Sequence, residues 1–225
     1  MCGRFTLKSP GRIKFDRVNC SNLPLVPRYN IAPSQSVLTI VQREVEREAM
    51  FLQWGLIPSW SKEAKGFINA RSETIKEKPS FSESFQKRRC LIPADGFFEW
   101  QRLGKLAQPY FFQMRDESPF AFAGIWDEWH QDEMSIASCA IITTEANELL
   151  ATIHDRMPVI LHPESHGTWL NHDSEPTKLR NLLVPFPASE MTSHAVSYEV
   201  NHPKIDDERL VRPVEANIGV TPSLF

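Results

Sequence analysis

The 225-residue sequence lacks the features of a secreted, membrane-bound or disulfide-bonded protein. No apolar run reaches the length of a transmembrane helix, and no secretory signal pattern opens the chain. The four cysteines are widely spaced and include no Cys-x-x-Cys pair, so we expect thiols rather than disulfides. These absences predict a cytoplasmic protein with no membrane partner.

An excess of positive charge is also missing. Lys and Arg number 25 against 28 Asp and Glu, which gives a formal net charge of −3. Since no global basic field attracts a nucleic acid, any nucleic-acid binding needs a local groove. Repeats, low-complexity linkers and a composition break are absent too. We therefore expect one domain over residues 1–225. We also expect a monomer.

The 17 prolines scattered along the chain predict many loops and short regular elements, most of which are expected to be strands. Runs rich in Val, Ile, Phe and Trp predict strands at 36–42, 49–54, 90–93, 96–101, 109–115, 120–129, 134–143 and 194–200. The charged stretch 43–48 joins the first two as a hairpin.

Helices are expected at 80–88, 145–152, 163–171 and 176–183. The pair Thr143-Thr144 suits the N-cap of the second helix, and Pro163 suits the first turn of the third. Most connections between strands are too short for crossover helices. The pattern predicts an α+β fold: a single domain with a mainly antiparallel, barrel-like sheet and short peripheral helices.

The start of the chain, Met1-Cys2-Gly3, carries the most distinctive chemistry. A small second residue generally allows removal of the initiator methionine, which would leave Cys2 with a free α-amine beside its thiol. Their reference pKa values are about 7.7–8.0 and about 8.5. An aldehyde can form an imine with the amine, and the thiol can then close a thiazolidine ring. A cysteine at position two is also compatible with an unimportant, frayed terminus.

Five polar clusters stand in apolar or tightly turning surroundings. They are Cys2-Gly3-Arg4-Phe5, Tyr29-Asn30-Ile31-Ala32-Pro33, Phe67-Ile68-Asn69-Ala70-Arg71-Ser72-Glu73-Thr74, Asp95-Gly96-Phe97-Phe98-Glu99-Trp100 and Ile153-His154-Asp155-Arg156-Met157-Pro158.

Three of these clusters hold candidates for proton transfer or orientation. Burial between Phe98 and Trp100 would raise the pKa of Glu99 towards neutrality, whereas strand alternation could instead place Glu99 in solvent. The imidazole of His154 suits a proton shuttle, or else lies in a plain surface loop. The amide of Asn69 can orient an amine or a sugar oxygen, or cap a turn.

Arginines and tryptophans beside these clusters are candidate nucleic-acid contacts. Arg4, Arg71 and Arg156 could together bind phosphates, although isolated arginines more often pair with surface acids. Trp54 and Trp60 flank a turn rich in Gly and Pro. If exposed they would stack on unpaired bases, and if buried they would be core.

The remaining cysteines and histidines predict no cofactor. Cys90 and Cys139 lie in apolar runs and are expected to be small buried residues. His162 and His166 have the spacing of a metal-binding pair on a helix, but no third ligand is evident nearby. We therefore expect neither a metal nor another cofactor.

Taken together, the motifs resemble the SOS-response-associated peptidase (SRAP) family of abasic-site processing proteins. The resemblance rests on motifs in the family's order from residue 1 to about 161, with a looser match at Tyr198–Asn201. They are Met-Cys-Gly-Arg-Phe, Tyr-Asn-Ile-Ala-Pro, Trp-Gly-Leu-Ile-Pro-Ser-Trp, Asn-Ala-Arg-Ser-Glu-Thr, Arg-Cys-Leu-Ile-Pro-Ala-Asp-Gly-Phe-Phe-Glu-Trp and His-Asp-Arg-Met-Pro-Val-Ile-Leu.

The resemblance implies a protein that binds single-stranded DNA carrying an abasic site and forms a thiazolidine crosslink through mature Cys2. It places the family's catalytic asparagine, glutamate and histidine on Asn69, Glu99 and His154. It also implies DNA contacts from the arginines and tryptophans, namely Arg4, Arg71, Arg156, Trp54, Trp60 and Trp100. A peptidase step that exposes Cys2, crosslink reversal and lyase-type strand cleavage belong to the same expectation, as does association with the nucleoid.

Two other classes of function remain open at this stage. Class II glutamine amidotransferases also begin Met-Cys-Gly and use the free amine as a base, but no Asn-Gly-Asp or Asn-Gly-Glu turn is present here. The second alternative is a non-catalytic single-stranded DNA-binding module in which Cys2 is incidental.

Overall fold

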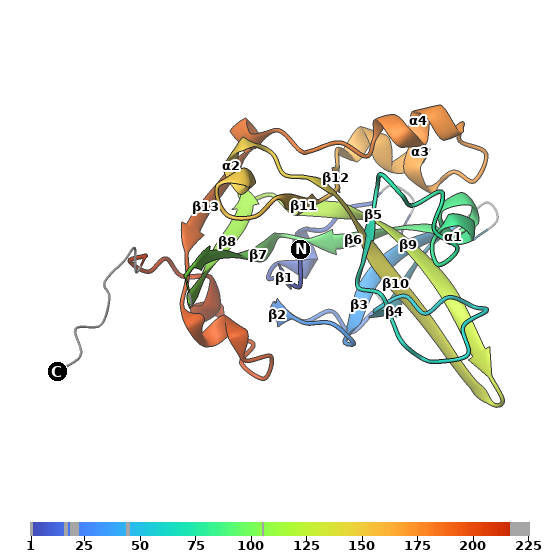
Figure 1. Ribbon diagram of the computed structural model, residues 1–225, viewed down its shortest axis with the longest axis horizontal. Helices are drawn as coiled ribbons and strands as arrows, with labels where there is room; N and C mark the ends of the chain where they lie inside the picture. Colours follow the sequence, from blue (N-terminus) through green and yellow to red (C-terminus); the bar gives the residue numbers. More distant parts are fainter. Residues whose placement is uncertain (1, 16–17, 19–22, 44–45, 105, 217–225) are drawn as a thin grey trace.

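A closed barrel of five strands forms one half of the fold (Figure 1). Its strands are β3 (Ser36–Arg43), β4 (Glu46–Trp54), β6 (Arg89–Ala94), β9 (Phe120–Gln131) and β10 (Met134–Glu145). Around the ring, β10 pairs with β4, β4 with β3, β3 with β6, β6 with β9, and β9 with β10. The β10–β4 contact is parallel and the other four are antiparallel, so the predicted barrel-like, mainly antiparallel sheet is confirmed.

A second sheet of five antiparallel strands packs beside the barrel. Its order is β13 (Met191–Ala195), β8 (Leu106–Met114), β7 (Gly96–Leu103), β1 (Arg4–Leu7) and β2 (Arg28–Ile31). Figure 1 shows this sheet at the left and the barrel at the right.

Short elements extend and cover the two sheets. The strand β5 (Asn69–Arg71) runs parallel to β10, β11 (Arg156–Pro158) pairs with β10, and β12 (Ile160–Leu161) pairs with β9. The α-helices are α1 (Ser82–Lys87), α2 (Glu148–Ala151), α3 (His166–Leu170) and α4 (Pro176–Asn181). The 3-10 helices are η1 (Pro10–Arg12), η2 (Pro163–Ser165), η3 (Ala188–Glu190), η4 (Tyr198–Asn201) and η5 (Glu208–Val211).

The computed structural model describes residues 2–15, 18, 23–43, 46–104 and 106–216. The expectations for four parts of the chain fall outside the described residues: Met1, Cys20, the tip of the expected hairpin at 44–45 and residues 217–225. Within it, no helix is both long and apolar enough to cross a bilayer.

Most of the expected elements are confirmed. The hairpin of β3 and β4 pairs Ser36 with Gln53 and Arg43 with Glu46, and the strand predictions from 90 to 143 correspond to β6 to β10. The four predicted helical regions contain α1, α2, η2 with α3, and α4.

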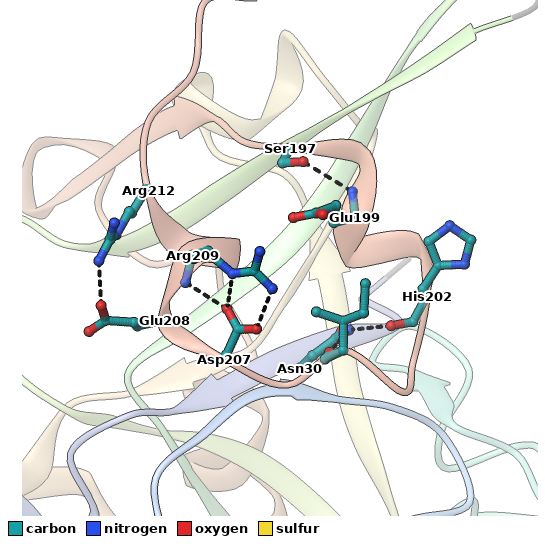
Figure 2. A network of polar contacts seen from close by, with 9 residues as sticks. Asn30, Ser197, Glu199, His202, Asp207, Glu208, Arg209 and Arg212 are labelled. Atoms are coloured by element: carbon teal, nitrogen blue, oxygen red, sulfur yellow. Dashed lines mark hydrogen bonds and ion pairs between the residues drawn. The ribbon is translucent and has the colours of Figure 1, made fainter.

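Two local predictions were wrong. Thr143 and Thr144 do not cap α2, because they still belong to β10; the N-cap is Asn147, whose side chain accepts a hydrogen bond from the backbone N–H of Leu150. The last strand is Met191–Ala195, and Tyr198–Asn201 is a 3-10 helix rather than a closing strand. Ser197 begins this turn, since its hydroxyl accepts from the N–H of Glu199 (Figure 2).

The hydrophobic core is divided into three clusters. The largest joins the barrel to the second sheet, where Phe5 packs edge-on against Trp54 and Phe122. A second cluster lies between the barrel and the helices α1, α3 and α4. The third lies on the other face of β7 and β8, where Phe98 contacts Phe111 under the C-terminal segment. Because β7 is therefore buried on both faces, alternation along it does not lead to solvent.

Buried polar groups fix the C-terminal segment onto β2. The buried side-chain amide of Asn30 donates to the carbonyl oxygen of His202 at 3.1 Å (Figure 2). It also donates to the carbonyl oxygens of Ile205 at 2.8 Å and Val200 at 3.3 Å. Asp206 accepts from the backbone N–H of Asn30 at 2.9 Å. The Tyr-Asn-Ile-Ala-Pro cluster is therefore structural at Asn30.

A buried arginine ties two helices to the barrel. Arg89 is 1% exposed, and its guanidinium donates to the carbonyl oxygens of Phe85 and Gln86 in α1 and of Trp169 and Asn171 at the end of α3, at 2.6–2.7 Å. These carbonyls have no partner within their own helices, and a cation at a helix C-terminus also complements the helix dipole.

We expect Arg89→Met to lower the free energy of unfolding by about 3 kcal/mol or more, because it leaves the buried carbonyls of Phe85 and Trp169 without their charged donor and removes two further hydrogen bonds. Urea unfolding measures this loss. The control is Lys87→Met, which removes an exposed cation from the same helix. Equal midpoints for Arg89→Met and the wild type would contradict the interpretation.

Candidate active site

Cys2 lies at the junction of the two sheets, immediately before β1. It is fully buried in the largest core cluster, and its thiol donates to the carbonyl oxygen of Arg4 at 3.7 Å. Burial raises the pKa of this thiol far above its ordinary value, and the negative charge of Glu99 raises it further. The thiol is therefore protonated at neutral pH and needs a base before it can act as a nucleophile.

Asn69 brings an amide to the same point from the barrel side. It begins β5, which the parallel pairing with β10 holds through Ile141. Its Nδ2 donates to the carbonyl oxygen of Cys2 at 2.9 Å. Its Oδ1 is buried and accepts no hydrogen bond from any residue that the structure describes. The amide thus fixes the backbone of Cys2 and keeps one buried acceptor beside it.

Glu99 approaches Cys2 from the second sheet. It lies on β7, which pairs with β1 so that Arg4 is opposite Phe98. Alternation along β7 turns Glu99 away from Phe98, as the sequence suggests, but that side faces the barrel, and Glu99 is 2% exposed. Burial raises the pKa of Glu99 from 4.5 to about 7. The predicted raised pKa is confirmed, and the solvent-facing alternative is wrong.

The raised pKa of Glu99 predicts a pH-dependent stability. Between about pH 4.5 and about pH 7 the folded protein holds a proton that the unfolded chain releases. The free energy of unfolding should therefore fall as the pH rises through this window, by roughly 3 kcal/mol for this group. Urea unfolding at the two ends of the window measures the fall. Glu99→Gln should flatten it, whereas Glu128→Gln, at an exposed acid on β9, should not. An equal fall in Glu99→Gln would contradict the assignment.

His154 occupies the turn between α2 and β11. The side chain of Gln101 on β7 donates to the carbonyl oxygen of Thr152, which ties this turn to the strand that carries Glu99. Nδ1 of His154 accepts the backbone N–H of Arg156 at 3.0 Å. Burial lowers the pKa of His154. With Nδ1 accepting this N–H, neutral His154 carries its proton on Nε2. The carboxylate of Asp155, 2.8 Å from Nδ1, favours a proton on Nδ1 instead and opposes the lowering of the pKa.

The three arginines differ in their surroundings. Arg4 is partly buried and donates to the carbonyl oxygen of Gly3 at 3.0 Å, and burial lowers its pKa. Arg71 is exposed at the end of β5. Arg156 is 13% exposed and pairs with Glu73 through both carboxylate oxygens. Glu73 belongs to one of the sequence motifs, but no sequence pattern predicted its ion pair with Arg156, which lies 83 residues further along the chain.

The tryptophans also differ, and the expectation for Trp54 was wrong. Trp54 is fully buried and donates to the carbonyl oxygen of Ile68 at 2.9 Å, so it supports the segment before Asn69 and cannot stack on a base. Trp100 is partly buried against the third core cluster, and its indole donates to Asn201 at 2.8 Å.

Trp60 is 61% exposed on an anchored loop. The backbone N–H of Ser59 donates to the carboxylate of Asp127, and the carbonyl oxygen of Ser61 accepts from the indole of Trp129. Both partners lie on β9, so the barrel fixes the loop on each side of Trp60. An exposed ring on a fixed backbone suits a stacking platform.

The two histidines with the spacing of a metal-binding pair have other contacts. His162 stacks on Phe186 with ring centroids 4.5 Å apart, and Nε2 of His166 lies 3.3 Å from the carbonyl oxygen of Leu161. Over the described part of the chain, no three His, Cys, Asp or Glu side chains are grouped as metal ligands would be. The buried thiols of Cys90 and Cys139 lie in the same core cluster as Cys2 and are free.

Around Cys2 the structure brings together the amide of Asn69 from β5 and the carboxyl group of Glu99 from β7, while the imidazole of His154 lies in a turn that Gln101 ties to β7. The family model described as SOS response associated peptidase (SRAP) matches residues 1–203, and the chain belongs to this family.

Comparisons with known proteins agree with this membership. The chain is 44% identical over 221 residues to the abasic site processing protein YoqW of Bacillus subtilis (strain 168), covering 94% of this chain and 99% of that protein. It is 30% identical over 224 residues to the abasic site processing protein YedK of Escherichia coli (strain K12), covering 95% and 100%. A crystal structure of a Bacteroides thetaiotaomicron protein superposes with a TM-score of 0.83 at 29% identity, covering 95% of this chain and all of that one.

Proposed function

We propose that this protein recognises abasic sites in single-stranded DNA and joins itself to the lesion through Cys2. The observation that carries the proposal is the placement of Cys2, at the amino terminus, beside Asn69 and Glu99 in a buried junction. The relatives YoqW and YedK bear the name abasic site processing protein, which supports the same substrate.

The chemistry balances without a cofactor once Met1 has been removed. The α-amine of Cys2 adds to the C1′ aldehyde of the ring-opened sugar, and the resulting carbinolamine loses water to give an imine. The thiol then adds across the C=N bond: sulfur bonds to carbon, and the thiol proton moves to nitrogen. The product is a thiazolidine, and the overall reaction releases one water.

The neighbouring side chains match the proton transfers of this sequence. Glu99, with a pKa of about 7, exists as acid and as base near neutrality, so it can protonate the departing hydroxyl and then accept the thiol proton. Asn69 holds the backbone of Cys2, and its buried Oδ1 is an acceptor for the freed amine. Neutral His154 can donate from Nε2 to the sugar ring oxygen, which opens the sugar, and act in reverse during release.

The DNA would follow the edge of the site marked by Arg4, Arg71 and Arg156, with Trp60 and Trp100 as stacking surfaces. We propose that the protein acts as a monomer at the nucleoid. The peptidase step is then limited to removal of Met1, which a host aminopeptidase could also perform. Lyase-type strand cleavage is a further proposed outcome at the same imine.

Binding to undamaged single-stranded DNA should weaken steeply with salt, because phosphate contacts release counterions. For about three arginine contacts, log K should fall with a slope of about −2 against log salt. Fluorescence anisotropy with a labelled oligonucleotide measures this slope. A flat response would contradict a phosphate-binding edge.

A denaturing gel tests the proposed function. Protein with a confirmed cysteine amino terminus is mixed with single-stranded DNA that holds one abasic site, beside an undamaged strand. We expect a shifted band that survives denaturant and needs the lesion. If no band forms, the proposal fails, and a glutaminase assay should then test the amidohydrolase alternative.

A further inference from the structure

Arg156 does not face the DNA edge as a free cation. Its Nη1 and Nη2 donate to the two carboxylate oxygens of Glu73 at 2.5 and 2.9 Å, and Nη2 also donates to the carbonyl oxygen of Thr143 at 2.6 Å. The guanidinium is the inner partner, with 13% of its side chain exposed, and the carboxylate is the outer one, with 51% exposed. Glu73 therefore covers the edge of Arg156 that a phosphate would use.

Glu73 also lies within the field of a second arginine. Hydrogen bonds from Arg156 are the main cause that lowers the pKa of Glu73, and the charge of Arg71 contributes to the same shift. Both arginines flank the end of β10: Arg71 pairs with Thr143, and Arg156 pairs with Glu145. One carboxylate thus faces two of the three arginines that we assign to DNA.

We propose that Glu73 is an intramolecular stand-in for a DNA phosphate, which holds Arg156 in its binding geometry and leaves when a strand binds. The inference rests on the proposed function, because it concerns how that site admits DNA. Carboxylate and phosphate oxygens both match the planar fork of a guanidinium, so one can replace the other on the same two donors.

The surroundings favour such an exchange. The carboxylate of Glu73 is half-exposed, so water can solvate it once it leaves, and the incoming phosphate would replace its two hydrogen bonds to Arg156. The carbonyl oxygen of Thr143 keeps its hydrogen bond to Nη2 during the exchange, and therefore the guanidinium stays in place. A bound DNA strand must displace Glu73 from Arg156. Glu73 therefore weakens the binding of DNA that makes few other contacts with the protein.

The test measures the affinity for an undamaged single-stranded oligonucleotide by fluorescence anisotropy at low salt. Glu73→Gln should bind about two- to fivefold tighter than the wild type, because the competing charge is gone. Glu77→Gln, at another exposed acid of the same loop, controls for the general change in charge. In an Arg156→Gln background, Glu73→Gln should not raise the affinity for DNA, because the guanidinium for which Glu73 and phosphate compete is absent.

The outcomes separate this inference from the proposed function. Equal or weaker binding by folded Glu73→Gln overturns the exchange, and so does an equal gain from Glu77→Gln. Thermal melting verifies folding, and Glu73→Ala, with the same expected gain, replaces Glu73→Gln if that variant is unstable. If the wild type binds no single-stranded DNA, the proposed function fails and the inference with it; if the wild type binds but the gain is missing, only the exchange fails.

Discussion

Cys2→Ala is expected to abolish the denaturant-resistant adduct with abasic DNA while leaving the weak binding of undamaged strands intact. The variant keeps its α-amine, so it can still form the imine, but without sulfur the ring cannot close. The imine hydrolyses on denaturation. A denaturing gel should therefore show no adduct unless borohydride is added first, because reduction converts the imine into a stable amine.

A matched control separates this chemistry from loss of folding. Cys139→Ala removes another fully buried thiol from the same core cluster, and it should form the adduct as the wild type does. Thermal melting of both variants checks that each is folded. A stable adduct of Cys2→Ala without borohydride would place the reaction on another nucleophile and contradict the thiazolidine.

An extension that stays attached before Cys2 is expected to block the adduct as completely as the loss of the thiol does. The α-amine would then be an amide, which cannot form an imine, and the thiol alone would give only a reversible hemithioacetal. Cys2 is fully buried and Asn69 holds its carbonyl oxygen, so added residues would also fill the space at the lesion. The measurement is the same gel, with a protein whose N-terminal tag ends at a protease site before Cys2.

Cleavage of that tag provides an internal control. Once the protease leaves Cys2 as the first residue, adduct formation should return to the untagged level, and a protein tagged at the C-terminus should crosslink throughout. A denaturant-stable adduct on protein that still carries its N-terminal tag would show that the free amine is not needed.

Most strands of the barrel could be predicted from the sequence because they hold apolar runs, and two pairs of them are adjacent along the chain. The hairpin of β3 and β4 and the hairpin of β9 and β10 follow from such runs and from short turns. The strand β5 has only three residues and is defined by its partner β10, so no local pattern indicates it. Tyr198–Asn201 looked like a strand, but Ser197 caps a 3-10 turn there.

The candidate site could be predicted as a set of residues but not as a geometry. The chemistry of Cys2 and the resemblance to the family indicate Asn69, Glu99 and His154. The sequence left open whether Glu99 faces solvent, because alternation on β7 is uninformative when both faces are buried. It also gave no reason to separate buried Trp54 from exposed Trp60, or to pair Arg156 with Glu73, since tertiary contacts decide both.

The most direct test of the central claim is mass spectrometry of the crosslinked amino-terminal peptide. The adduct is formed without borohydride and digested with nuclease and protease before fragmentation. We predict a peptide that begins at Cys2 and carries the sugar remnant with the loss of one water, and fragment ions that place the remnant on Cys2. A remnant on a lysine, or on a peptide that still begins with Met1, would contradict the thiazolidine at Cys2.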